Sequence, residues 1–183
     1  MVIAPSRLLL AAFALSVAFA APLAAQEAEP PLVTRGRVEL NLRGAEVILK
    51  AAREKAESQK LLNNIAVVDA GGHLLAFARM DGARPASGQT ALTKAVAAAT
   101  FRQETGPLPA KGEPDLLLSL SLAAAAAGSG GKLTPLKGGV PIVVDGQIVG
   151  AVGVGGGTGE QDAEVAKAGI QALLDLLAAE KAR

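Results

Sequence analysis

The sequence predicts an α+β fold in which an antiparallel sheet of two hairpins is flanked by helices. Apolar runs at 141–144 and 148–154 surround Asp145-Gly146, a pair suited to a type I′ turn because both central positions need positive φ. Two further runs surround Ala70-Gly71-Gly72. Helical periodicity lies before, between and after these pairs. Neither hairpin leaves room for a crossover helix, which disfavours parallel winding and favours an antiparallel sheet covered on at least one face.

The N-terminal residues 1–25 have the composition of a secretory signal peptide. A basic residue precedes a long apolar run, and small residues follow it. Cleavage is expected at the end of this segment, with cleavage after Ala20 as the alternative. Residues 26–37 then form an extended lead, and 38–183 form a single domain. No stretch beyond the signal is long and apolar enough to span a membrane, so the mature chain is expected to be periplasmic or secreted.

The first helix and the first hairpin are predicted from local patterns. A helix from Leu42 to about Lys60 is expected because Asn41 can cap it and apolar residues recur at helical spacing. Ile65–Asp69 and His73–Met80 have the composition of the two strands of the hairpin. The expected buried face of the helix comprises Leu42, Ala45, Ile48, Leu49, Ala52 and Ala56.

The middle of the chain is alanine-rich and then irregular. Ser87 is expected to cap a helix that runs to about Gln103. Prolines and glycines predict a loop over 105–114. Residues 115–127 have the composition of a short helix, although their Leu/Ser alternation also fits a strand. A short strand is expected at Leu133–Leu136, before the second hairpin.

The last helix is predicted to begin after a glycine turn, Gly155–Gly157. Thr158 and Gln161, three residues apart, have the spacing of a capping box. The turn matches neither the G-x-G-x-x-G nor the P-loop pattern, and Glu160 and Asp162 disfavour an anion at the helix start. The glycines are therefore interpreted as a tight joint and as one wall of a pocket. The apolar stripe of the helix comprises Val165, Ile170, Leu173, Leu174 and Leu177.

Composition excludes several classes of function. Residues 1–25 carry one arginine and no acid, so the mature chain has 17 basic and 17 acidic residues and no electrostatic footprint for nucleic acid. The sequence has no Cys, Trp or Tyr and one histidine, His73. Cysteine catalysis, a four-ligand zinc site within one chain and aromatic stacking on nucleic-acid bases are therefore excluded. One histidine is also a weak basis for acid–base catalysis.

Four side chains are candidates for binding, and each also has a purely structural interpretation. His73 follows a glycine turn, which favours an exposed turn residue over an iron ligand. Met80 ends the same strand and is most simply core filling. Their opposite parity argues against both binding one iron within one chain. Arg79 can pair with a propionate or with a neighbouring aspartate. Lys94 can bind an anion, but a solvated lysine whose stem packs on the core is the commoner case.

Two motifs resemble the GlcG/HbpS family. The first is DAGGHLLAFARMDGA at 69–83, and the second begins with GGVPI at 138–142 and continues with GAVGVGGGTGEQD at 150–162. The resemblance covers about residues 38–180. It implies a small antiparallel α+β domain of profilin-like layout that forms homo-oligomers and binds haem, with haem degradation in some members. A related module occurs with corrinoid adenosyltransferases, and one secreted branch works beside a sensor kinase.

The resemblance makes an extracytoplasmic haem-binding protein the leading hypothesis, with His73 or Met80 as iron ligand and no catalytic residue assigned. One alternative is a corrinoid-binding protein or an enzyme accessory acting on a small acid. Another is an oligomeric sensory or structural partner that self-associates through Leu116–Ala127. A membrane sensor or a haem-transport protein is the expected partner. The predicted cofactor-binding residues are His73, Arg79, Met80, Thr134, Gly156, Gly157 and Thr158.

Overall fold

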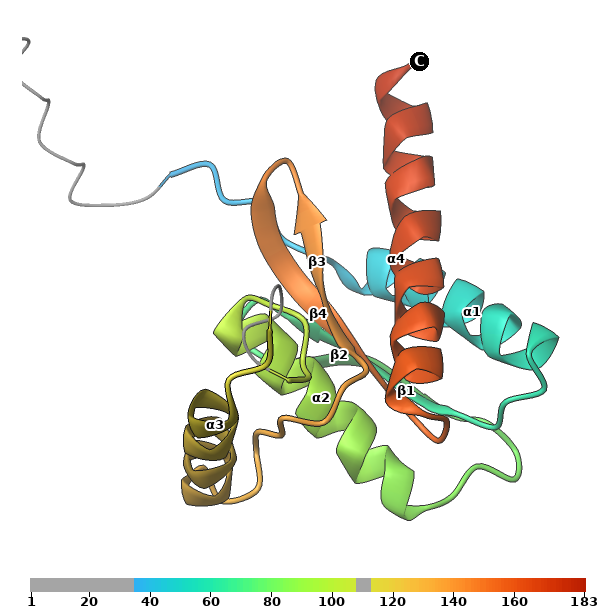
Figure 1. Cartoon of the computed structure of the whole chain (residues 1–183). Coiled ribbons are helices and arrows are strands. Elements are labelled where there is room, and N and C mark those ends of the chain that lie inside the picture. The colour runs from blue at the N-terminus through green and yellow to red at the C-terminus, as the bar shows by residue number, and fades with distance from the viewer. Residues whose placement is uncertain (1–34, 108–112) are drawn as a thin grey trace, which may run out of the picture. The chain divides into compact units, whose positions relative to one another are not determined.

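Eight helices and strands follow one another in residues 35–107 and 113–183, the parts of the chain that the computed structural model describes (Figure 1). The predicted signal peptide, 1–25, and residues 26–34 of the predicted lead lie outside the described residues. The elements are α1 (Leu42–Ser58), β1 (Asn64–Asp69), β2 (Leu74–Arg79), α2 (Ala86–Phe101), α3 (Leu116–Gly128), β3 (Gly139–Val144), β4 (Gln147–Gly155) and α4 (Gly159–Lys181).

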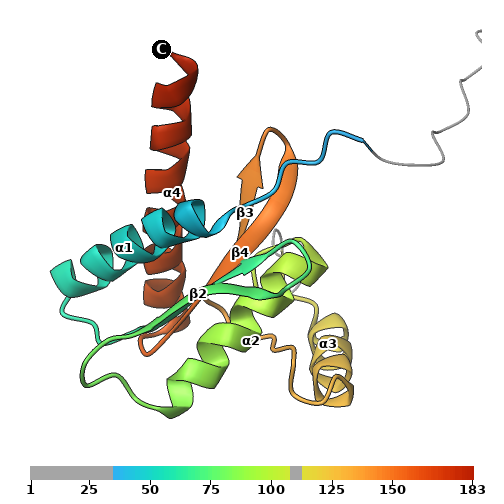
Figure 2. The ribbon, with the colours of Figure 1, turned by 180° about the vertical axis from the view of Figure 1, so that it is seen from behind.

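The four strands form one antiparallel sheet in the order β2-β1-β4-β3. The two hairpins therefore join through their inner strands, β1 and β4, which confirms the predicted α+β class. Asp145 has φ 49° and Gly146 has φ 74°, the positive values that a type I′ turn requires. Figure 2 shows that helices cover both faces of the sheet, α2 on one and α1 with α4 on the other.

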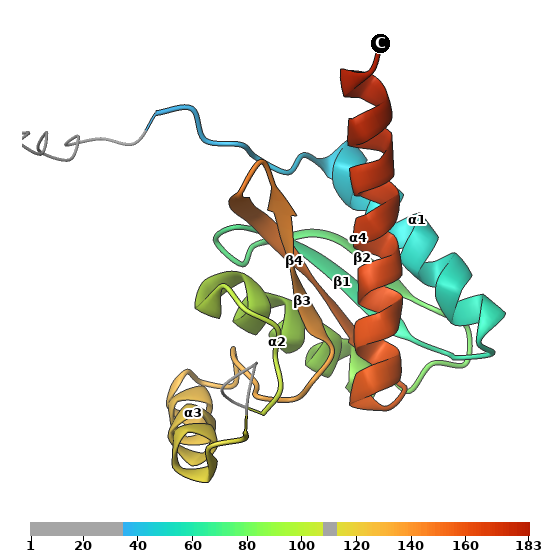
Figure 3. The same ribbon diagram turned by 45° about the horizontal axis from the view of Figure 1, so that its top comes forward.

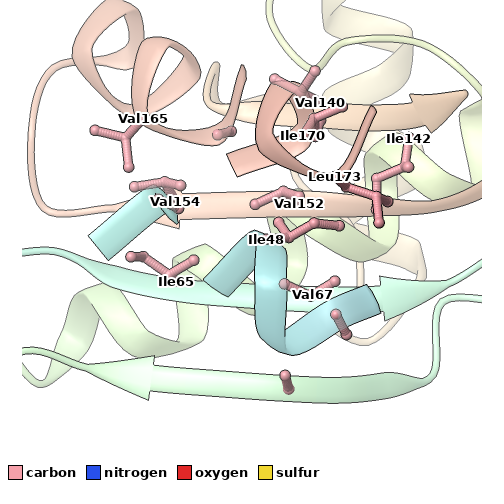
Figure 4. Packing of buried hydrophobic residues seen from close by; sticks show 14 of the residues in the cluster. Ile48, Ile65, Val67, Val140, Ile142, Val152, Val154, Val165, Ile170 and Leu173 are labelled. Atoms are coloured by element: carbon pink, nitrogen blue, oxygen red, sulfur yellow. The ribbon is translucent and has the colours of Figure 1, made fainter. Parts of the chain in front are cut away.

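The larger core lies between the sheet and the helices α1 and α4 (Figure 4). Alternate residues of the inner strands, such as Ile65 and Val67, face this side, where they meet Ile48 of α1 and Val165 of α4. Burial of this apolar surface holds the layers together. The predicted face of α1 is correct except at Leu42, which is 54% exposed because it lies in the first turn, beyond the edge of the core.

The helix α2 lies directly on the opposite face of the sheet. This smaller core consists of alanines and valines, including Ala91, Ala95 and Val68. A Cβ added at Gly153 of β4 would overlap the backbone of Ala91 and Ala95, and one added at Gly155 would lie 2.7 Å from the Ser87 carbonyl. The glycines of β4 therefore allow the helix backbone to approach the sheet closely.

Two local predictions in the middle of the chain are wrong. Ser87 does not cap α2: the helix begins at Ala86 after Pro85, whose φ of −56° is already helical, and Ser87 is buried. Leu133–Leu136 is not a strand. Instead, the hydroxyl of Thr134 accepts the Leu136 N–H at 3.2 Å in a local turn.

Residues 116–128 form a helix, α3, as predicted, and the strand alternative is wrong. The Asp115 carboxylate caps the helix by accepting the Leu118 N–H at 3.0 Å. The Ser121 hydroxyl bonds back to the Leu117 carbonyl at 2.8 Å, as serines within helices often do. The alanine run also favours a helix. Figure 3 shows α3 beside α2 and away from the sheet. A strand formed by these residues would therefore have no neighbouring strand to pair with.

Candidate functional site

His73 lies on the turn between β1 and β2, held by the carboxylate of Asp69. That carboxylate accepts the backbone N–H groups of Gly71 at 2.8 Å and His73 at 2.9 Å, and it lies 3.1 Å from His73 Nδ1. Partial burial raises the pKa of Asp69, but the bonds from His73 and Gly71 outweigh it, and the pKa lies below its ordinary value. Asp69 is therefore ionised at neutral pH and fixes the imidazole.

The His73 side chain is 83% exposed, which confirms the interpretation as an exposed turn residue. Its Nδ1 is engaged by Asp69, and Nε2 has no hydrogen-bond partner in the described part of the chain. A carboxylate on one ring nitrogen orients the other and makes it a better metal ligand. His73 therefore keeps its structural position in the turn and leaves one ring nitrogen open to a ligand.

Arg79 and Met80 share a hollow of about 380 Å³ at the other end of β2. Met80 packs against the core, which confirms that interpretation, and its sulfur receives the Asn63 N–H at 3.4 Å. Arg79 forms no ion pair with an aspartate within residues 35–107 and 113–183. Its guanidinium is therefore available to a carboxylate from outside. The lining residues are Arg53, Glu57, Ala78, Arg79, Met80 and Asp81.

His73 and Met80 flank β2 at its two ends. At about 3.3 Å per residue, the strand separates them by roughly 20 Å. One iron cannot bind both within one chain, as predicted. The parity of the two residues is not the reason, because both lie just outside the strand Leu74–Arg79.

A buried ion pair, Lys94 with Asp162, lies beneath the glycine turn between β4 and α4. Lys94 Nζ is 2.7 Å from Asp162 Oδ2 and donates to the Val154 carbonyl at 2.8 Å. The side chains are 6% and 2% exposed. Asp162 Oδ1 accepts Asn63 Nδ2 at 3.1 Å and the Gly157 N–H at 2.9 Å. The four bonds tie α2, β4, α4 and the segment before β1 together.

Two interpretations made from the sequence are wrong for this pair. Lys94 is not a solvated lysine, because α2 is buried on most of its surface and Lys94 lies among its buried residues. A buried ammonium group is stable only when an opposite charge pairs with it. Asp162 does not leave its negative charge open at the start of α4, because Lys94 neutralises it. One signal was present in the sequence: Lys94 is the one charged residue among the alanines of 86–101.

The glycine turn is a tight joint, as its interpretation predicted. A Cβ added at Gly156, which has φ 137°, would lie 2.6 Å from the Leu62 carbonyl. The predicted capping box is present: Thr158 Oγ1 accepts the Gln161 N–H at 3.3 Å, and Gln161 Oε1 accepts the Thr158 N–H at 2.9 Å. Gly156 and Gly157 line a groove, whereas Thr158 is occupied by capping and does not line it.

Thr134 lies elsewhere again, where it lines a cavity of about 10 Å³ together with Phe101 and Leu122. The predicted cofactor-binding residues therefore occupy four places: the β1–β2 turn, the hollow at Met80, the glycine turn and this small cavity. The structure does not bring them together around one ligand within one chain.

Comparison with known proteins decides the family. A family model described as haem degrading protein HbpS-like matches residues 40–171, well over half of the chain. The chain belongs to the HbpS-like family. Protein GlcG of Escherichia coli K12 is 44% identical over 118 residues, which cover 64% of this chain and 82% of GlcG.

Solved structures agree with this membership in the HbpS-like family. A double mutant of Streptomyces reticuli HbpS is 31% identical, with a TM-score of 0.62, and the match covers 79% of this chain and 97% of that one. A PduOC:haem complex is 25% identical, with a TM-score of 0.62, over 74% of this chain and 95% of PduOC. The chain therefore shares the fold of HbpS and of PduOC, and it is the PduOC structure that holds haem.

Two further properties bear on the site. Within 35–107 and 113–183, no helix is long and apolar enough to cross a membrane. The same residues contain no group of three or more His, Cys, Asp or Glu side chains placed to hold a metal ion.

Proposed function

We propose that this HbpS-like protein binds haem outside the cytoplasm, with His73 as the axial iron ligand. The observation that carries the proposal is the imidazole fixed by Asp69 at Nδ1, with Nε2 free on an exposed turn. A neutral imidazole nitrogen is a common axial ligand of haem iron. The family model and the PduOC:haem complex support the choice of ligand.

The residues around His73 fit haem in part. The donor chemistry suits one axial bond, and Leu74 beside it is 51% exposed and offers apolar surface to a macrocycle. Bound ligands of this size are usually covered over most of their surface, whereas this turn is open. Haem would supply a redox-active iron. His73 and Asp69 would hold and orient it, and a second copy of the chain is the proposed cover.

Titration of the mature protein with haemin tests the haem proposal. A saturable, red-shifted Soret band at a fixed ratio of haem to subunits is expected, and His73→Ala should abolish the spectrum of the ligated iron. Asp69→Asn should weaken binding at least about tenfold, because it removes the group that orients the ring. Met80→Leu, a volume-conserving control, should leave the spectrum unchanged. Because Trp and Tyr are absent, protein concentration must come from backbone absorbance.

A flat titration would contradict haem binding, and an unchanged His73→Ala spectrum would exclude His73. The apolar segment 1–25 supports the extracytoplasmic location, where a membrane sensor or a haem-transport protein is the proposed partner. The protein for titration is therefore prepared from the periplasmic fraction or the medium of cells expressing the full chain. Recovery from the cytoplasm alone would contradict the location.

We also propose that the protein is a homo-oligomer that self-associates through α3. Leu116 and Leu117 are 72% and 77% exposed, and Leu120 is 56% exposed. The range Leu116–Gly128 contains no charged residue, which is unusual for a helix with exposed leucines. A second copy of the same uncharged helix is a self-complementary partner for such a surface.

Light scattering at micromolar concentration tests self-association. An oligomer is expected for the native chain, and Leu117→Glu should shift it towards the monomer because the interface would bury a charge. Leu176→Glu, at a comparably exposed leucine of α4 (51%), is the matched control and should leave the assembly intact. A monomeric native protein, or equal effects of both variants, would contradict the proposed surface.

A further inference from the structure

A groove of about 590 Å³ lies between the start of α2, the glycine turn and the first turn of α4. It is separate from the proposed haem ligand, because His73 lies at the opposite end of the sheet. Lys94 and Asp162 line it from inside, and Arg84, Lys137 and Glu160 add charged groups towards solvent. The groove therefore connects a buried pair of charged side chains with charged groups at the surface.

Lys94 has one hydrogen-bond donor that no acceptor in the described part of the chain takes up. Its ammonium carries three N–H groups, of which one faces Asp162 Oδ2 and one the Val154 carbonyl. No third acceptor occurs in the described residues, although the side chain is only 6% exposed. Buried donors are nearly always satisfied, and this one belongs to a residue that lines the groove. An acceptor bound in the groove would complete its set of bonds.

Arg84 supplies a second, independent donor group. Its guanidinium is exposed and has no ion-pair partner among the residues that the structure describes, whereas Lys137 pairs with Glu160 at 3.1 Å. Two hydrogen bonds hold the backbone of Arg84 in place at the edge of the groove. Its carbonyl accepts Asn64 Nδ2 at 3.1 Å and the Ser87 N–H at 3.1 Å. A guanidinium presents a planar fork that matches the two oxygens of a carboxylate.

The charges of the groove select the class of anion. Three cations and two carboxylates line it: Arg84, Lys94 and Lys137 against Glu160 and Asp162. One negative charge therefore neutralises the groove, and a second would meet two acidic side chains. We propose that the groove binds a small organic monocarboxylate, with Arg84 holding the carboxylate and Lys94 donating its unused N–H from within.

Titration of the haem-free, ¹⁵N-labelled protein with lactate, followed by amide chemical shifts, tests this site. Saturable shifts are expected at Gly156 and Gly157, which line the groove. Arg84→Gln should weaken binding at least about tenfold, and Arg84→Lys should give an intermediate affinity because it keeps the charge and loses the fork. Arg43→Gln, at an exposed arginine of α1 that lies outside this groove, should bind as the native chain does.

Shifts that do not saturate, or that persist unchanged in Arg84→Gln, would overturn the proposal. Tighter binding of inorganic phosphate or succinate than of lactate would also overturn it, because the groove would then favour two negative charges. The amide shifts are measured without haem, so a failure of lactate to bind would not affect the result of the haemin titration. If haem does not bind, the amide shifts still test the carboxylate site. Arg84 is exposed, so its variants can be compared in the folded state.

Discussion

Lys94→Met is expected to lower the free energy of unfolding by about 3–5 kcal/mol, since it removes one partner of a buried ion pair. Asp162 would keep the N–H groups of Asn63 and Gly157 but lose its counter-charge at 2% exposure. The Val154 carbonyl would also lose its donor. Methionine fits the volume of the lysine stem, so the loss reflects the charge rather than a cavity. Urea unfolding of both proteins measures the difference.

A surface pair provides the control for this prediction. Lys55 Nζ lies 2.7 Å from Glu164 Oε1, the same distance as in the buried pair, but these side chains are 33% and 53% exposed. Lys55→Met should therefore cost at most about 1 kcal/mol. The double variant Lys94→Met with Asp162→Asn should lose less than the sum of its two single changes, because it leaves no unpaired charge. A loss below 1 kcal/mol in Lys94→Met would contradict the role of the pair.

Local signals predicted most of the fold correctly. Three local features could be recognised in the sequence because each depends on residues a few positions apart. They are the Asp145-Gly146 turn, the Asn41 cap and the capping box of Thr158 with Gln161. The single antiparallel sheet was also predicted, whereas its strand order, with β1 beside β4, was not, because it depends on pairing between distant segments. Ser87 failed as a cap because Pro85, two residues earlier, already has a helical φ.

The candidate site was less predictable, because its decisive contact is not local. Lys94 and Asp162 are 68 residues apart and meet only when α2 and α4 pack at the glycine turn. Each residue was predicted on the correct helix. Neither periodicity nor spacing could predict that the two helices pack so that these charged side chains contact each other in the interior. His73, in contrast, was correctly interpreted as an exposed turn residue, because its environment is the local turn closed by Asp69.

Gly153→Ala is expected to destabilise the protein by about 3 kcal/mol, the upper range for adding a methyl group to a packed core. The new Cβ would overlap the backbone of Ala91 and Ala95, and a main chain cannot rotate away as a side chain can. α2 must then move off the sheet, and Lys94 moves with it. Thermal and urea unfolding measure the loss, and the amide shifts of Gly157, which donates to Asp162, report whether the ion pair has opened.

Gly128→Ala separates this effect from the general consequence of replacing a glycine. Gly128 ends α3, has open space where a Cβ would lie and has no positive φ, so alanine should be neutral or stabilise the protein by up to about 1 kcal/mol. A stable Gly153→Ala protein with unchanged Gly157 shifts would show that α2 can withdraw while Lys94 stays paired. The position of Lys94 beneath the groove would then not depend on the close contact between α2 and the sheet.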